Sequence, residues 1–227
     1  MSAHPHTLDP DAPVVYEQYE DIDQQQETYI IGMWSFLVTE VMMFGALFLI
    51  YTLYRWSFQG EFFIFHEVLD WKWGGLNTMN LLFSSFLMAK AVQAAQLNKT
   101  KAQMRYLAGT IVCAFIFLVI KFIEWKPKFE HHLVPNNTFH WPPAEHPELG
   151  GNPEHARIFY SLYFIMTGLH GIHVVLGIIA IGILMMMTKA KSKVITDYIP
   201  TEMVGLYWHF VDLVWIFLYP LFYLIPK

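Results

Sequence analysis

The sequence predicts an all-α polytopic membrane protein, built as a bundle of five transmembrane helices. Hydrophobic residues make up 55% of the 227 residues and charged residues only 15%, whereas soluble domains carry roughly 25% charged residues. Five apolar segments are each long enough to cross a hydrocarbon core, which takes about 20 helical residues. These segments lack the alternating polar and apolar positions of a barrel strand, so helices are the expected spanning elements.

Residues 1–28 form a polar, acidic tail without Lys or Arg, unlike the start of a cleavable signal peptide. We expect this tail to be loose and cytoplasmic. Residues 29–227 form the five-helix transmembrane domain, in which a long hydrophilic loop at 126–157 separates the third span from the fourth. The predicted spans cover residues 29–54, 76–97, 105–125, 158–188 and 203–225.

Basic residues in the short connections predict the orientation of the chain. Lys99 and Lys101 lie in one short loop on the N-terminal side, and Lys189, Lys191 and Lys193 lie in the other. Because Lys and Arg in short loops favour the cytoplasmic side, we expect a cytoplasmic N-terminus and a periplasmic or external C-terminus. The net charge is −5 and the basic residues are scattered, which argues against nucleic acid as a partner.

The sequence places the carboxyl of Glu40 close to the middle of the membrane. It lies about eleven residues into the first span, roughly 16 Å along the helix axis. An ionised group there costs about 2.5–3.5 kcal/mol on insertion, so we expect a protonated carboxyl that is hydrogen-bonded inside the protein. The last two spans offer polar groups at comparable depth, and His209 and Asp212 are the best candidate partners. A purely structural hydrogen bond and a functional carboxyl both fit this position.

Three histidines and an aspartate accompany Glu40 in the predicted in-membrane polar network. His170 and His173 are three residues apart, as are His209 and Asp212, so each pair shares one helix face. The three histidines could form a metal site or provide haem ligands. Hydrogen-bonded histidines between closely packed helices are the alternative, which the glycines around them favour.

Four residues are candidates for interfacial or lipid contacts. Lys121 and Glu124 are three residues apart at the end of the third span, where an ion pair at the membrane surface accounts for both. Trp208 and Lys189 complete this set. The loop at 126–157 contains five histidines without regular spacing, so we expect it to contact a partner rather than a metal.

Three segments together resemble cytochrome c oxidase subunit III, of the haem-copper oxidase superfamily. Residues 32–44, GMWSFLVTEVMMF, are similar to the first shared helix of the family, which carries an in-membrane carboxylate. Residues 167–177, TGLHGIHVVLG, and residues 207–215, YWHFVDLVW, are similar to its last two spans. The likeness covers about residues 30–223 and matches the five-span bacterial type rather than the seven-span type.

The resemblance implies a non-redox subunit of a proton-pumping oxidase in aerobic respiration. In this family the haems and coppers lie in subunits I and II, so the resemblance implies no catalytic, cofactor-binding or metal-binding residue on this chain. It also implies bound phospholipid, support for the stability and proton uptake of subunit I, and a place in the bacterial inner membrane. Glu40 falls at the family's carbodiimide-reactive carboxyl.

The implied partners are oxidase subunits I and II and membrane lipids, and the resemblance also allows a subunit IV and a respiratory supercomplex. Cytochrome c is the electron donor that Glu40 and residues 207–212 favour, with a quinol-oxidising haem-copper oxidase as the alternative. A histidine-ligated membrane cytochrome is a third hypothesis. Haem ligation by two histidines needs partners on separate helices, whereas His170 and His173 lie on the same helix. A small proton-coupled transporter would need broken helices or an inverted repeat, and the sequence displays neither.

Overall fold

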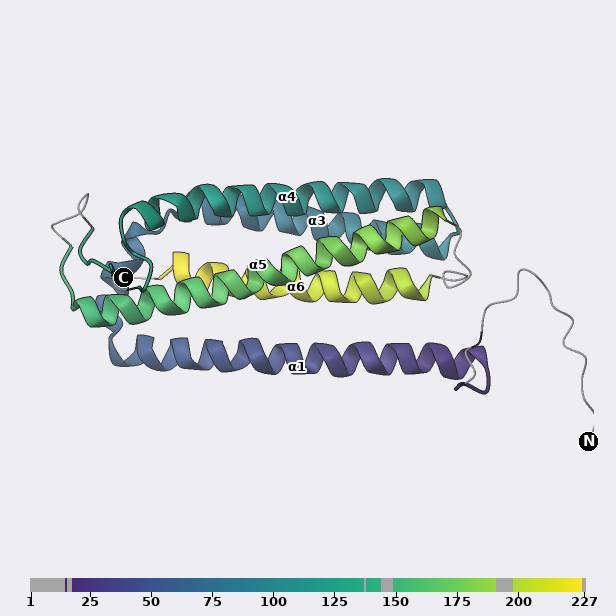
Figure 1. Cartoon of the computed structure of the whole chain (residues 1–227), viewed down its shortest axis with the longest axis horizontal. Coiled ribbons are helices and arrows are strands. Elements are labelled where there is room, and N and C mark those ends of the chain that lie inside the picture. The colour runs from purple at the N-terminus through teal and green to yellow at the C-terminus, as the bar shows by residue number, and fades with distance from the viewer. Residues whose placement is uncertain (1–14, 16–17, 137, 144–148, 191–197, 226–227) are drawn as a thin grey trace, which may run out of the picture.

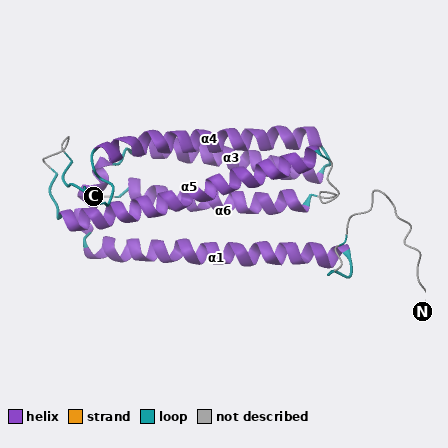
Figure 2. Ribbon diagram, viewed as in Figure 1, coloured by secondary structure: helices purple, strands orange, loops and turns teal. Residues whose placement is uncertain are grey.

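The computed structural model describes all residues except 1–14, 16–17, 137, 144–148, 191–197 and 226–227, and in these its regular structure consists of helices without a strand. Five long helices run along one common direction, and a short helical connection follows the first of them (Figures 1 and 2). The helices are α1 (Ile22–Ser57), α2 (Gln59–Phe65), the 3₁₀ helix η1 (His66–Val68), α3 (Trp71–Gln96), α4 (Thr100–Glu130), α5 (Pro153–Lys189) and α6 (Ile199–Tyr223).

The prediction of an all-α polytopic membrane protein is confirmed, but not the number of spans. Among the described residues, four helices are long and apolar enough to cross a membrane, namely α1, α4, α5 and α6. The helix that contains the predicted span 76–97 is α3, which has 26 residues. This helix is long enough to span a membrane. Its hydroxyl and amide side chains lower its hydropathy, and it is not among the four candidates; examples are Asn77, Thr78, Ser84 and Ser85.

The centre of the bundle is α6, which packs against α1, α3 and α5. The closest pairing is between α3 and α4, whereas α1 lies at the edge and contacts α5 and α6 (Figure 1). Fully buried aromatic rings fill the space between the helices, with Trp208 and Trp215 of α6 among the largest. At Gly177 of α5, an added Cβ would lie 2.7 Å from the ring of Trp208. A side chain at position 177 would therefore collide with Trp208, so this contact between α5 and α6 requires a glycine.

The first helix begins earlier than the sequence predicts. Residues 22–28, which we assigned to the loose tail, form the first turns of α1. The side chain of Asp21 accepts a hydrogen bond of 2.7 Å from the backbone N–H of Gln24. This N-cap satisfies one of the exposed donors at the start of the helix, so helical structure begins before the apolar segment.

The connection between α4 and α5 is shorter than the predicted loop at 126–157. The helix α4 continues through Pro127 to Glu130, because a proline near a helix end removes only one backbone hydrogen bond. The helix α5 begins at Pro153, where the side chain of Asn152 accepts a hydrogen bond of 3.0 Å from the N–H of Glu154. The residues between the two helices are therefore 131–152.

Candidate functional site

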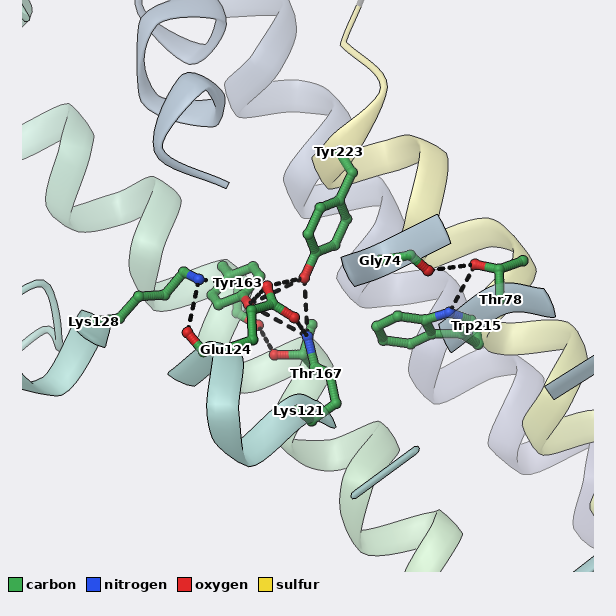
Figure 3. A network of polar contacts seen from close by, with 9 residues as sticks. All are labelled: Gly74, Thr78, Lys121, Glu124, Lys128, Tyr163, Thr167, Trp215 and Tyr223. Atoms are coloured by element: carbon green, nitrogen blue, oxygen red, sulfur yellow. Dashed lines mark hydrogen bonds and ion pairs between the residues drawn. The ribbon is translucent and has the colours of Figure 1, made fainter. Parts of the chain in front are cut away.

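A buried group of charged and tyrosine side chains joins three helices near the end of the bundle at which α4 and α6 finish (Figures 1 and 3). Lys121 and Glu124 of α4 form an ion pair with 2.9 Å between Nζ and Oε2. The Lys121 Nζ also donates to the hydroxyls of Tyr163 on α5, at 3.3 Å, and Tyr223 on α6, at 2.9 Å. Both tyrosines in turn donate hydrogen bonds to Oε1 of Glu124. We refer to these four residues and Lys128 as the charge cluster.

Lys128 brings a second cation to the same carboxylate. Its Nζ lies 3.4 Å from Oε1 of Glu124 and donates to the backbone carbonyl of that residue at 3.1 Å. The spacing of Lys121, Glu124 and Lys128 puts all three on one face of α4. Two cations therefore surround one carboxylate. The ring of Trp215, whose centroid is 4.9 Å from the Lys121 Nζ, offers its electron-rich face to the excess positive charge.

The predicted ion pair between Lys121 and Glu124 is present, but it lies inside the protein rather than at a membrane surface. Both residues are less than 10% exposed, at 7% and 6%. The reason is tertiary, since Tyr163 and Tyr223 close over the pair from two other helices. Lys128 and these tyrosines were not among the predicted site residues. Lys128 follows Lys121 by seven residues, or two helical turns, so the sequence could have placed both on one helix face. Nothing in the sequence distinguishes the two tyrosines from the aromatic residues of a membrane interface.

Among the described residues, the side-chain partner of Glu40 on α1 is His173 of α5. The carboxylate Oε2 lies 3.0 Å from Nε2 of His173, and the two side chains are 16% and 9% exposed. The other ring nitrogen, Nδ1, lies 2.8 Å from the carbonyl oxygen of Leu169. A carbonyl only accepts, so Nδ1 is the nitrogen that donates to Leu169 and Nε2 is the nitrogen that meets Glu40. This contact links the edge helix α1 to the rest of the bundle.

The predicted partners of Glu40 lie elsewhere, which corrects that expectation. His209 and Asp212 are on the side of α6 that faces α3, because Nδ1 of His209 lies 2.7 Å from the hydroxyl of Ser85. The Ser85 hydroxyl is also near the Asp212 carboxyl, but its hydrogen bond goes to the histidine. The helix α6 stands between α1 and α3, so a residue that faces α3 cannot reach Glu40.

A row of hydrogen bonds fastens α6 to α3. Trp208 donates its indole N–H to the hydroxyl of Ser84 at 3.0 Å, and Trp215 donates to the hydroxyl of Thr78 at 3.1 Å. Trp208 is fully buried, so the prediction that it contacts lipid is wrong. Its ring occupies the space that Gly177 leaves open, which no lipid-facing position would provide. The polar side chains of α3 therefore serve contacts inside the bundle.

The three histidines considered as metal or haem ligands have three different surroundings. His173 meets Glu40 of α1, His209 meets α3, and His170 is packed between aromatic rings of α4 and α6 at centroid distances of 5.4 and 5.2 Å. Within the described part of the chain, no three His, Cys, Asp or Glu side chains converge as metal ligands would. His170 and Asp212 are buried without a hydrogen bond to another described residue. The predicted polar network is thus divided into separate parts.

Lys189, the last of the predicted interfacial residues, is the final residue of α5 and is exposed. A cation at this position lies next to the unpaired carbonyls of the helix C-terminus, which carry partial negative charge. Its exposed position at a helix end is the feature that the structure gives for its predicted interfacial role.

Comparison with known proteins relates the chain to oxidase subunits. The family described as "Cytochrome c oxidase subunit III" matches residues 155–226, which contain most of α5 and all of α6. A protein of Synechocystis named "Cytochrome c oxidase subunit 3" is 29% identical, with 86% of this chain and 75% of the relative covered. A protein of Pseudomonas putida named "Cytochrome bo(3) ubiquinol oxidase subunit 3" is also 29% identical, with coverages of 86% and 85%.

A third relative is a fused protein. "Heme-copper oxidase subunit I+III" of Aeropyrum pernix is 27% identical over 86% of this chain, which spans only 22% of that relative. The similarity in all three cases extends far beyond the residues that the family match covers. The four spanning helices, the glycine-lined contact of α5 with α6 and the polar pairs described above thus belong to a chain similar to subunit III proteins over most of its length.

Proposed function

We propose that this chain, which belongs to the subunit III family of the haem-copper oxidases, is the non-redox subunit III of a proton-pumping terminal oxidase in aerobic respiration. The observation that carries the proposal is the family match at residues 155–226. This stretch supplies Tyr163 and Tyr223 to the charge cluster, His173 to the pair with Glu40, and the close contact of Gly177 with Trp208. The matched residues therefore contribute to each of these contacts between helices.

In this role the chain supports the stability and proton uptake of subunit I and holds phospholipid, while haem and copper lie in subunits I and II. The charge cluster supports a structural role for this chain, because its polar atoms form hydrogen bonds and ion pairs that connect α4, α5 and α6. Subunits I and II are the expected partners, with a subunit IV and a supercomplex as further associations of the same complex.

The proposal includes α3 as the fifth span. At 1.5 Å per residue its 26 residues extend roughly 39 Å, which exceeds the ~30 Å hydrocarbon core. Its surface residues Met79, Phe83 and Phe86 are apolar and more than half exposed, whereas its hydroxyl groups face α6. With five spans the termini lie on opposite sides, and we expect the N-terminus in the cytoplasm because Lys and Arg in short connections favour that side.

Cytochrome c is the electron donor in the principal form of the proposal, and a quinol is the alternative. A relative named for cytochrome c and a relative named for ubiquinol are both 29% identical to this chain, which keeps the alternative open. The donor binds to other subunits, so the purified complex must answer this question rather than the chain by itself.

The decisive experiment is purification of the tagged chain from its native membranes, followed by haem and copper assays and identification of the chains that accompany it. We expect a larger haem-bearing subunit and a copper-bearing subunit to co-purify, and the complex to oxidise reduced cytochrome c faster than quinol. An unrelated multi-pass protein with the same tag is the control. Haem that stays with the separated single chain, or the absence of any haem-bearing partner, would refute the proposal.

A further inference from the structure

Three buried polar side chains take no part in the hydrogen bonds and ion pairs between the helices. Asn77 of α3 and His170 of α5 are fully buried, and Asp212 of α6 is 3% exposed. Each has two polar side-chain atoms, and none of these atoms forms a hydrogen bond with another described residue. We refer to these three residues as the central layer. Buried polar groups in proteins are almost always hydrogen-bonded, so the central layer calls for a ligand that enters the bundle.

The residues of the central layer are grouped around Trp215 of α6. Asp212 precedes Trp215 by three residues, or about one helical turn, which is ~5 Å along the axis. Trp215 donates its indole N–H to the hydroxyl of Thr78 on α3 (Figure 3), and Asn77 is the neighbour of Thr78 in the chain. The ring of His170 has its centroid 5.2 Å from that of Trp215. The three side chains therefore come from three helices to about the same level of the bundle.

The central layer lies deep in the membrane-spanning part of the bundle. Asp212 is close to the midpoint of α6 and His170 to the midpoint of α5, and both helices are long and apolar enough to span a membrane. The ring of Phe117 on α4 covers the layer from a fourth helix, with centroid distances of 5.4 Å to His170 and 4.9 Å to Trp215. Lipid tails offer no hydrogen bonds at this depth, so the ligand must be small enough to stay between the helices.

Water fits the hydrogen-bonding groups of the central layer better than a metal ion does. The Asn77 amide offers two N–H donors and a carbonyl acceptor, and the His170 ring has at least one N–H donor. A metal ion cannot accept a hydrogen bond from these donors, whereas a water molecule both donates and accepts. The Asp212 carboxyl can accept hydrogen bonds from the same molecules. A buried water makes about three hydrogen bonds, so on the order of two molecules serve the unpartnered atoms of the three residues.

We propose that the central layer is a binding site for a small cluster of water molecules in the interior of the bundle. Because Asn77, His170 and Asp212 belong to different helices, the same water molecules join α3, α5 and α6. The charge cluster joins α4, α5 and α6 nearer one end of the bundle, and it does so by direct contacts. The inference goes beyond the proposed function, because it concerns the interior of this chain and holds for either electron donor.

The test is X-ray hydroxyl-radical footprinting of the purified complex. X-rays convert water molecules, including bound ones, into hydroxyl radicals that oxidise the side chains beside them, and mass spectrometry measures the oxidation of each residue. We expect Phe117 to be oxidised several-fold faster than Phe159. Both rings are at most 1% exposed, but Phe159 lies among other phenylalanine rings, those of Phe62, Phe65 and Phe222. Oxidation of the two rings at the same rate would overturn the inference.

A variant of the central layer tests the role of its polar groups. Asn77→Leu replaces the amide with an apolar group of similar shape, and it should lower the oxidation of Phe117 several-fold while leaving that of Phe159 unchanged. Gln93→Leu is the matched control, because it removes an amide from an exposed position of the same helix. If Asn77→Leu does not assemble, His170→Phe is measured in its place, with the same expected result. Unchanged oxidation of Phe117 in the variant would overturn the inference.

Exchange of sodium chloride for choline chloride distinguishes water from an alkali cation. A water cluster predicts the same oxidation of Phe117 in both salts. Faster oxidation without sodium would mean that a cation occupies the central layer, which would overturn the inference. Co-purification of haem is measured first, so failure of the proposed function is seen separately, and Phe117 is compared with Phe159 in the purified full chain in either case.

Discussion

The charge cluster and the Glu40–His173 pair both place a carboxylate inside the bundle, but they hold it in different ways. The side chain of Glu124 is 2% exposed and contacts lysines of its own helix and tyrosines of two others. The side chain of Glu40 is 16% exposed and, among the described residues, has His173 as its partner. The difference shows that several polar contacts around one carboxylate lock α4, α5 and α6 together. The helix α1 is joined to them by the pair of Glu40 with His173, by a hydrogen bond from the Tyr51 hydroxyl to the carbonyl of Leu221 on α6, and by apolar packing.

Burial decides how much each carboxylate contributes. A buried charge that loses its counter-charge is left in a medium that solvates it poorly, which costs several kcal/mol. A side chain near the surface of the bundle can relax or reach other polar groups, so the cost of losing its partner is smaller. The following predictions vary burial and the number of partners separately.

Glu124→Leu should have the largest effect. It leaves Lys121 and Lys128 buried without an anion, and breaking such an arrangement costs about 3–5 kcal/mol. We expect a corresponding decrease in the free energy of unfolding in SDS titrations and a low yield of assembled complex. Glu124→Gln, which keeps an acceptor but not the charge, should be intermediate. If Glu124→Leu were as stable as the parent, the charge cluster would not lock the three helices.

Tyr223→Phe should have the second largest effect. It keeps the ring but removes a hydrogen bond to a carboxylate, and such a bond contributes about 1.5–3 kcal/mol. Tyr219→Phe is the control on the same helix, because the Tyr219 hydroxyl donates to the carbonyl of Trp71 at an exposed position. The same SDS titration should therefore distinguish the two variants, and equal losses would contradict the special position of Tyr223.

Glu40→Leu should loosen α1 while leaving the other helices packed. It leaves Nε2 of His173 without its partner, at a cost of about 1–3 kcal/mol. Glu40→Gln preserves a hydrogen bond and should preserve assembly. Limited proteolysis after α1 and the turnover of the purified oxidase measure the effect. Normal assembly and turnover in Glu40→Leu would exclude a packing role for this carboxyl.

Lys126→Gln should have the smallest effect on stability. The contact of Lys126 with Glu130 is long and solvent-exposed, and exposed pairs of this spacing contribute only about 0.3–0.5 kcal/mol. The SDS titration should scarcely distinguish this variant from the parent. A loss as large as that of Tyr223→Phe would mean that the comparison between buried and exposed ion pairs does not hold for this protein.

The helical nature of the chain could be predicted from the sequence because apolar segments of this length and composition have few alternatives in a membrane. The pair of Lys121 and Glu124 could also be predicted, since its spacing is local. Their burial could not, because the covering tyrosines come from residues 39 and 99 positions further along the chain. The predicted third span ended at residue 125, before Pro127, whereas α4 continues to Glu130 and includes Lys128.

The partner of Glu40 shows a second limit. Helical periodicity indicates which residues of α6 share a face, and it correctly groups His209 with Asp212. It does not indicate which neighbouring helix that face meets. In the structure the face meets α3, and Glu40 instead meets His173. The order of helices around α6 decided the outcome, and that order follows from packing along the whole bundle.

The separation between Glu40 and His173 has a consequence for biosynthesis. The two residues are 133 positions apart in the chain, and ribosomes add about 5–20 residues per second. Glu40 therefore enters the membrane on the order of ten seconds before its partner has been synthesised. During that interval α5 and α6, the long helices that α1 contacts, have not yet been completed. The polar contacts that fasten α1, Glu40 with His173 and Tyr51 with the carbonyl of Leu221, therefore form late in synthesis.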